Sequence, residues 1–220
     1  MAGVIFDLDG VLVDSAEFHY RAWQALADRI GVPFDRQANE ALRGVDRMNS
    51  LLLLLGPHAV RFSEAEKEAF CAEKNAQYVL LIADITPAGL LPGAGELLTA
   101  LRAAGIPAAV ASSSKNARPV VASLGIESLL TAIVDGSEVK RAKPDPELFL
   151  LAAARLGQAP AQCVVVEDAQ AGVEAGLAGG MRVIGIGDPA RVGAAQRVVH
   201  GTDEISVAMI RGLLEDGVTV

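Results

Sequence analysis

The segment from Val4 to Leu12 constrains the fold more than any other part of this sequence. A short run rich in Val, Ile and Phe predicts a buried strand, and it leads into Asp7-Leu8-Asp9-Gly10. Alternate side chains of an extended backbone share a face, so Asp7 and Asp9 can address one site. Two carboxylates this close repel each other, which favours a cation or a proton between them. If the strand belongs to an open α/β sheet, its carboxyl end faces the crevice in which such sheets bind ligands.

Two simpler interpretations of this segment compete with a ligand site. Asp9-Gly10 is also typical of a hairpin turn, and the segment alone favours neither alternative. A calcium loop would need an acid at its fifth position and a glutamate at its twelfth, where the sequence has Val11 and Phe18. A calcium loop is therefore excluded, and the turn remains an alternative.

The composition is typical of a globular protein with one large domain or two small ones. Of the 220 residues, 51% are apolar and 21% are charged. The formal net charge of −8 argues against a nucleic acid or an anionic membrane as partner, because such partners bind basic sites. A small anionic substrate is compatible with this charge if basic residues gather locally.

Nothing in the sequence predicts export or insertion into a membrane. Cys71 and Cys163 are far apart, without the spacing of a metal site or a disulfide framework. The N-terminus lacks a basic start and reaches Asp7 before an apolar signal segment forms. No apolar run approaches the ~18 residues that a membrane helix needs. We therefore expect a cytoplasmic protein without a membrane partner.

Hydrophobic periodicity divides the chain into a helical block and a region in which strands and helices alternate. From about Ser15 to Thr86 the pattern is helical, and Ser63-Glu64-Ala65-Glu66 predicts a capping box. Further strands are predicted at residues 107–111, 132–135, 164–166 and 182–186, and a short strand with a terminal helix at 198–220. Such alternation indicates a doubly wound parallel sheet. We predict an α/β core domain of residues 1–14 and 87–220 with an inserted α-helical cap domain, residues 15–86.

Polar residues follow four of the predicted strands, and in a parallel sheet all four positions lie on one edge. They are Asp7 and Asp9, then Ser112, then Lys143 beyond Asp135, and then Glu167 with Asp168. Each has an ordinary explanation, since serines cap helices, a lysine before proline can lie in a solvated loop, and acids favour helix N-termini. Their joint placement favours a single site.

The ordered set Asp7-Leu8-Asp9-Gly10, Ser112, Lys143-Pro144 and Glu167-Asp168 resembles the haloacid dehalogenase superfamily of phosphotransferases, over the whole predicted core. The resemblance implies a Rossmann-like core in which Asp7 attacks phosphorus and becomes an aspartyl phosphate. It implies that Asp9 serves as general acid and base. Ser112 would hold the transferring phosphoryl oxygens, and Lys143 would balance the charge.

The same resemblance implies a Mg²⁺ cofactor. The ligands would be Asp7, the backbone carbonyl of Asp9 and Asp168, with Glu167 contributing directly or through water. Magnesium is a hard cation that prefers oxygen ligands and retains several waters, which suits this set.

Further motifs, mostly in the predicted cap, resemble one family of the superfamily, the β-phosphoglucomutases. These motifs are residues 17–23, 44–47, 74–75 and 114–116. The resemblance implies interconversion of β-D-glucose 1-phosphate and glucose 6-phosphate through β-glucose 1,6-bisphosphate. Arg47 would anchor the second phosphate, because its planar fork matches phosphate. The substrate-binding residues that the resemblance implies are Ser15, His19, Trp23, Arg43, Gly44, Val45, Arg47, Lys74, Ser113, Ser114, Lys115 and Asn116.

Three positions depart from the pattern of that family. Ser15 stands where a threonine is expected, Ser113 replaces a small apolar residue, and Asp46 places an acid beside Arg47. Taken without the resemblance, Trp23 on a helix is typical of a core residue, and Arg47 could be a solvated surface residue.

The main alternative function is a sugar-phosphate phosphatase of the same superfamily, in which water hydrolyses the aspartyl phosphate. A catalytically silent binding protein is a third alternative, but the retention of both N-terminal acids, Lys143 and the predicted metal ligands argues against it. Dehalogenation is disfavoured because it needs neither Asp9 as an acid nor a metal. We expect a small sugar phosphate as the partner, no nucleic acid, and a monomeric protein.

Overall fold

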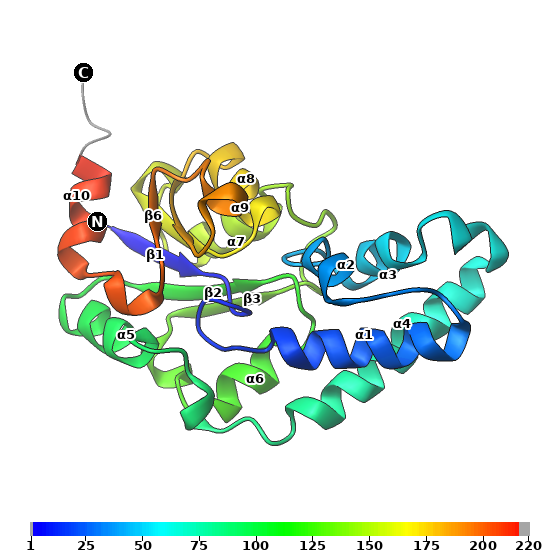
Figure 1. The fold of residues 1–220 in the computed structure, drawn as a ribbon. Coiled ribbons are helices and arrows are strands. Elements are labelled where there is room, and N and C mark those ends of the chain that lie inside the picture. The colour runs from blue at the N-terminus through cyan, green and yellow to red at the C-terminus, as the bar shows by residue number, and fades with distance from the viewer. Residues whose placement is uncertain (1, 216–220) are drawn as a thin grey trace.

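The computed structural model describes residues 2–215, which form a parallel sheet with helices on both faces (Figure 1). The strands are β1 Gly3–Phe6, β2 Ala108–Ser112, β3 Ala132–Asp135, β4 Cys163–Glu167, β5 Arg182–Ile186 and β6 Arg197–Val199. Their order is β3-β2-β1-β4-β5-β6, and every neighbouring pair is parallel. The predicted doubly wound sheet is therefore confirmed. The order reverses between β1 and β4, where open α/β sheets form their ligand crevice.

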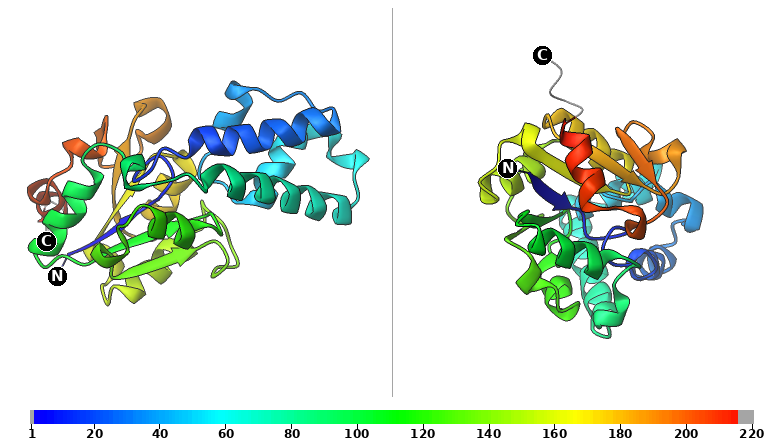
Figure 2. Two further views of the ribbon diagram at one scale, coloured as in Figure 1. Left: turned by 90° about the horizontal axis from the view of Figure 1, so that it is seen from below. Right: turned by 90° about the vertical axis from the view of Figure 1, so that its left-hand side faces the viewer.

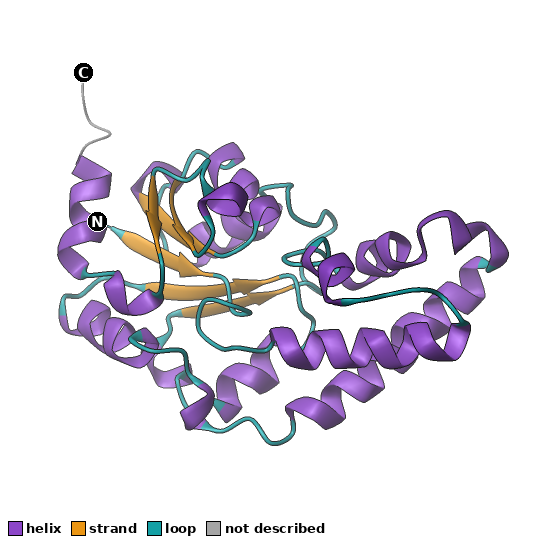
Figure 3. Ribbon diagram, viewed as in Figure 1, coloured by secondary structure: helices purple, strands orange, loops and turns teal. Residues whose placement is uncertain are grey.

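The helices account for most of the remaining chain (Figure 3). They are α1 Ala16–Ile30, α2 Arg36–Glu40, α3 Arg47–Leu55, α4 Glu64–Ile82, α5 Ala94–Ala103, α6 Ala117–Ser123, α7 Glu147–Arg155, α8 Gln170–Ala178, α9 Pro189–Val192 and α10 Val207–Glu215. Short helices such as α2 and α9 were not predicted, because so few residues show no periodicity. None of the helices in the described chain is both long and apolar enough to cross a bilayer.

The two faces of the sheet are covered by different helices, as the side-chain alternation of β1 illustrates. Val4 and Phe6 pack into a cluster with residues of α5, α6 and α10, whereas Ile5 packs into a cluster with residues of α7, α8 and α9. All three side chains are fully buried. A parallel sheet covered on both faces leaves only its ends for a polar site.

The first strand ends where the apolar run that predicts it ends, directly before Asp7. β1 ends at Phe6, and the chain turns at Gly10, whose φ of 85° suits glycine. The chain does turn here, since the N–H groups of Leu12 and Val13 both donate to the Leu8 carbonyl, at 3.0 and 3.1 Å. The hairpin interpretation is nevertheless wrong, because β1 pairs in parallel with both of its neighbours, β2 and β4. The turn keeps Asp7 and Asp9 at the end of the strand.

Helices α1 to α4, called here the helical unit, lie beyond the carboxyl ends of the strands (Figures 1 and 2). Helix α4 packs against both α1 and α3, and Ser63 and Glu66 form the predicted capping box at its start. The unit has an apolar cluster of its own, which includes Trp23, Leu26, Leu51, Leu55 and Phe70. The predicted helical character of residues 15–86 is observed, and the domain boundaries at 15 and 86 stay a prediction.

The C-terminal part of the described chain lies at the opposite end of the sheet from the helical unit (Figure 1). β6 and α10 correspond to the predicted short strand and terminal helix. Residues 216–220 of that predicted segment lie outside the described residues.

Candidate active site

Three carboxylates from two neighbouring strand ends meet in the crevice. Asp7 follows β1, while Glu167 ends β4 and Asp168 follows it. One oxygen from each lies within 4.8 Å of the others, and the residues are 4%, 0% and 5% exposed. Burial, together with the neighbouring acids, raises the pKa of Asp7 well above its usual range and that of Asp168 to about 7. These three residues are called the acid cluster below.

Lys143 supplies the positive charge inside the acid cluster. Its Nζ lies 2.6 Å from Asp7 Oδ1 and 2.7 Å from Glu167 Oε1, and its side chain is fully buried. Burial alone would lower the pKa of the Lys143 ammonium, but the charges of Asp7 and Glu167 outweigh it and raise the pKa. The loop between β3 and α7 thus brings Lys143 to the predicted nucleophile.

The acid cluster fits a hard divalent cation. It offers carboxylate oxygens only, which are the donors that Mg²⁺ prefers. Lys143 and Arg43, whose Nη1 lies 3.1 Å from Asp168 Oδ2, do not balance three carboxylates. Gly10 is also required here, because a Cβ at this position would overlap the Asp168 carboxylate. Backbone and side chains together therefore leave room for a cation beside buried, under-compensated charge.

Asp9 lies beside Asp7 but has different partners. Its N–H donates to Asp7 Oδ2 at 3.1 Å, the Ser15 hydroxyl donates to Asp9 Oδ1, and the Ser112 hydroxyl donates to Asp9 Oδ2 at 3.4 Å. Burial would raise the pKa of Asp9, but His19 and Ser15 outweigh burial and lower it. The pKa values of Asp7 and Asp9 therefore shift in opposite directions, because the two carboxylates have different neighbours.

A basic pair from the helical unit reaches toward Asp9. His19 Nε2 lies 3.7 Å from Asp9 Oδ1, and Lys74 Nζ lies 2.9 Å from His19 Nδ1. The Lys74 ammonium also lies 4.9 Å and 4.6 Å from the ring centroids of Trp23 and Tyr78. Burial and the nearby Arg47 lower the pKa of Lys74 to about 7, and burial and Lys74 lower that of His19.

A second group of polar residues lies farther from the acid cluster. This distal cluster consists of Arg47, Ser114, Lys115 and Asn116. Arg47 begins α3 and is half-buried, and among residues 2–215 it forms no ion pair with an acid. The neighbouring Asp46 does not neutralise it, because its carboxylate caps α3, accepting from the N–H groups of Met48 and Asn49 at 3.0 Å and 3.2 Å.

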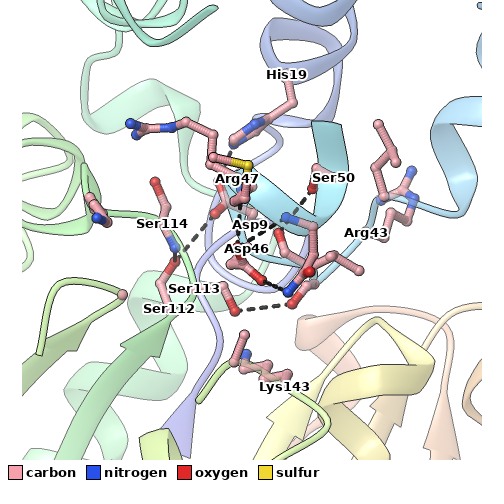
Figure 4. A pocket seen from close by; sticks show the side chains of 18 of the residues that line it. Asp9, His19, Arg43, Asp46, Arg47, Ser50, Ser112, Ser113, Ser114 and Lys143 are labelled. Carbon is pink, nitrogen blue, oxygen red and sulfur yellow. Dashed lines mark hydrogen bonds and ion pairs between the residues drawn. The ribbon is translucent and has the colours of Figure 1, made fainter. Parts of the chain in front are cut away.

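One cavity of about 400 Å³ joins the two clusters (Figure 4). In Figure 4, His19 and Arg47 reach it from the helical unit, and Ser112 and Lys143 reach it from the core. Of the predicted site residues, all but two line it; the exceptions are Ser15 and Glu167. Both are fully buried behind the cavity wall, Ser15 against Asp9 and Glu167 against Lys143.

The helical unit touches the core across the cavity at several points. Arg43 contacts both Glu40, at 2.9 Å, and Asp168, and the Ser113 hydroxyl donates to the Gly44 carbonyl at 3.0 Å. Arg191 of the core contributes to the same contacts. Its Nη1 lies 3.2 Å from Glu40 Oε2, and its Nε donates to the Asp168 carbonyl at 2.7 Å. These contacts hold the unit over the acid cluster.

Sequence reasoning missed several residues of this site. Glu40 and Arg191 form an ion pair although they are 151 positions apart in the sequence, and no local sequence pattern predicts such a pair. Asn75 was noted only as part of a motif, yet it accepts hydrogen bonds from two members of the distal cluster. The Tyr78 hydroxyl is buried and has no hydrogen-bond partner among the described residues.

Comparisons with known proteins agree with the geometry. Residues 1–180 match the family described as haloacid dehalogenase-like hydrolase. The chain is 42% identical to a protein of Bacillus subtilis (strain 168) named beta-phosphoglucomutase, over 96% of this chain and 94% of that protein. It is 37% identical to hexitol phosphatase A of Escherichia coli (strain K12), over 93% of each. The crystal structure of beta-phosphoglucomutase from Clostridium difficile superposes with a TM-score of 0.94 at 38% identity, covering 98% of both chains.

Proposed function

Because the chain belongs to the haloacid dehalogenase-like hydrolase family, we propose that this enzyme interconverts β-D-glucose 1-phosphate and glucose 6-phosphate. The reaction would pass through an aspartyl-phosphate enzyme and β-glucose 1,6-bisphosphate, as in a β-phosphoglucomutase. One observation supports the proposal most strongly: the acid cluster lies on one side of a single cavity and Arg47 lies on the other. Among the described residues, Arg47 forms no ion pair with an acid. A sugar with two phosphates matches both ends.

Asp7 is the nucleophile in this proposal. A carboxylate oxygen of Asp7 forms a bond to phosphorus while the bond from phosphorus to the sugar oxygen breaks. Lys143, 2.6 Å from Asp7 Oδ1, offsets the charge of the nucleophile and of the arriving phosphoryl group. The Ser112 hydroxyl, near Asp9, is placed to donate to the transferring phosphoryl oxygens.

Asp9 moves the proton. As an acid it protonates the leaving sugar oxygen, and as a base it later removes the proton from the hydroxyl that attacks the aspartyl phosphate. Its partner His19 lies in α1 of the helical unit, and its partner Ser15 directly precedes α1. The contacts of Asp9 therefore depend on the position of the helical unit relative to the core. This dependence would tie proton transfer to a closed cavity.

The acid cluster would hold Mg²⁺ through Asp7, Asp168 and the Asp9 carbonyl, with Glu167 contributing directly or through water. When bound, the ion supplies positive charge beside the transferring phosphoryl group. The buried, under-compensated carboxylates described above support this assignment.

Isomerisation requires a binding site for the second phosphate. Arg47 would hold it with Ser114, Lys115 and Asn116, and the charge of Arg47 is available because Asp46 caps α3 instead. Arg43, Gly44, Val45 and Lys74 line the same cavity and would contact the sugar.

We further propose that residues 15–86 form a cap domain and that the protein acts as a monomer in the cytoplasm. The separate apolar cluster of the helical unit supports the first statement. The second is supported by a site built from one chain, and by two buried cysteines without a disulfide, which suit a reducing compartment.

The decisive experiment supplies β-glucose 1-phosphate, magnesium and a trace of the 1,6-bisphosphate, and measures glucose 6-phosphate against free phosphate. Rapid formation of glucose 6-phosphate with little free phosphate is expected. Release of phosphate with little isomer would instead establish a sugar-phosphate phosphatase, the activity class that hexitol phosphatase A represents among the relatives.

A further inference from the structure

We propose that Asn75 is a positioning residue that joins Arg47 and Asn116 into one anion site, and that it thereby favours isomerisation over hydrolysis. This inference rests on the proposed function of the cavity and deepens it. Asn75 does not line the cavity itself, so it would act through the two residues that do.

A single oxygen of Asn75 holds both partners. Asn75 Oδ1 accepts from Arg47 Nη2 at 2.7 Å and from Asn116 Nδ2 at 2.9 Å. Arginine is only a donor, so its partner atom must be the amide oxygen rather than the amide nitrogen. The three residues come from α3, from α4 and from the loop that precedes α6, and Asn75 is the point at which these segments meet.

The amide at position 75 is suited to this role because it is neutral. It fixes the direction of the Arg47 guanidinium and leaves the positive charge for a ligand. A carboxylate at the same place would form an ion pair with Arg47 and cancel much of that charge. Asp46, the neighbouring acid, is occupied at the start of α3, so both nearby polar side chains leave Arg47 free to bind an anion.

The hydrogen bond between Asn75 and Asn116 also joins the helical unit to the core. Asn75 belongs to the helical unit, whereas Asn116 belongs to the core and lies 41 positions away. A phosphate held by Arg47 and Asn116 would therefore draw the two sides together. Closure of this kind excludes water from a reactive intermediate, and here the intermediate is the aspartyl phosphate. Asn75 would thus help to determine whether a sugar hydroxyl or water attacks.

The test compares Asn75→Ala, which removes the acceptor, with Asn75→Asp, which keeps the shape and adds a negative charge. Gln77→Glu is the matched control, because it adds the same charge at an exposed position of α4. Each protein is assayed for glucose 6-phosphate and free phosphate from β-glucose 1-phosphate, and for hydrolysis of p-nitrophenyl phosphate, which has no second phosphate.

We expect the KM for β-glucose 1-phosphate to rise about 2- to 10-fold in Asn75→Ala, because Arg47 and Asn116 lose the acceptor that positions them but keep their own contacts with the ligand. In Asn75→Asp we expect a rise of about 10- to 100-fold, because the charge of Arg47 is also cancelled. The ratio of free phosphate to isomer should rise in both, while hydrolysis of p-nitrophenyl phosphate and all activities of Gln77→Glu should match wild type.

Unchanged KM and product ratio in both Asn75 variants would overturn the proposal, as would an equal loss in all three assays, which indicates a structural role. Failure of the proposed function is detected separately, as release of phosphate without formation of glucose 6-phosphate by the wild type. That result would also overturn the proposed effect of Asn75 on the ratio of isomer to free phosphate. The anion-site role of Asn75 would then be decided by the KM for phosphate release, which must rise in Asn75→Asp and not in Gln77→Glu.

Discussion

The acid cluster and the distal cluster face each other across one cavity, yet charged side chains are paired with opposite charges only in the acid cluster. In the acid cluster, Asp7 and Glu167 are almost fully buried and are paired with Lys143 at 2.6 Å and 2.7 Å. In the distal cluster, Arg47 is half-buried and its polar partner is the neutral Asn75. A charge taken out of water needs a partner in the protein, whereas a charge that must bind a ligand is best left without one.

The two clusters also differ in how they are assembled. The acid cluster and Lys143 come entirely from strand ends and loops of the core, so their separation is set by the sheet. The distal cluster combines Arg47 of the helical unit with Asn116 of the core. We therefore expect the acid cluster to be preformed and the distal cluster to form only when the helical unit closes over the core. The same closure would exclude water from the cavity.

Asp9, which lies between the clusters, gives the largest expected effect. Asp9→Asn should slow the formation of glucose 6-phosphate by about 10²–10⁴-fold, since it removes a general acid and base. The exposed Asp14→Asn is the control and should behave as wild type. Unchanged turnover in Asp9→Asn would remove Asp9 from the mechanism and leave proton transfer to another group.

Lys143→Met tests whether charge pairing in the acid cluster also maintains the fold. It leaves Asp7 and Glu167 buried without their ammonium partner, and should lower the free energy of unfolding by about 3–5 kcal/mol in urea titrations with EDTA. Lys140→Met, an exposed change in the same loop, should stay within about 0.5 kcal/mol of wild type. Similar losses in the two variants would show that the buried pair adds no stability.

Arg47→Ala tests the distal cluster in the same way. Loss of a charge-assisted contact costs about 1.5–3 kcal/mol, so isomerisation should fall about 10- to 150-fold. Hydrolysis of p-nitrophenyl phosphate should be spared, and so should the stability to urea, because Arg47 is no buried ion-pair partner within the described chain. Arg61→Ala, at an exposed arginine of the helical unit, is the control. Equal losses of both activities would mean that Arg47 does not anchor a distal phosphate.

Lys74 sharpens the comparison, since it is buried like the acid cluster and, like Arg47, forms no ion pair with an acid in the described part of the chain. Burial lowers its pKa from 10.5 to about 7. Between these pH values the unfolded chain binds a proton that the folded chain does not, so the stability of the wild type should rise with pH. Lys74→Met removes this contribution, and the gain in stability from pH 7 to pH 9.5 should shrink by about 3 kcal/mol. Identical pH profiles in urea unfolding would show that folded Lys74 keeps its ordinary pKa.

Much of the fold follows from local patterns in the sequence. The strands predicted at residues 107–111, 132–135, 164–166 and 182–186 lie within one residue of their predicted bounds. The segment from 15 to 86 is helical as predicted, and the capping box at Ser63 is present. Because neighbouring strands are parallel, the polar residues after them had to gather at one edge. That placement depends only on periodicity and chain direction, which short stretches of sequence carry.

Residue types and strand ends alone therefore determined which groups could meet: Asp7, Ser112, Lys143 and Asp168. Only the tertiary structure decided which side chains contact one another; it places Arg43 against Asp168, and Asn75 between Arg47 and Asn116. Such contacts join segments as many as 125 positions apart. Their geometry depends on how every intervening element packs, and no short stretch of sequence contains that information.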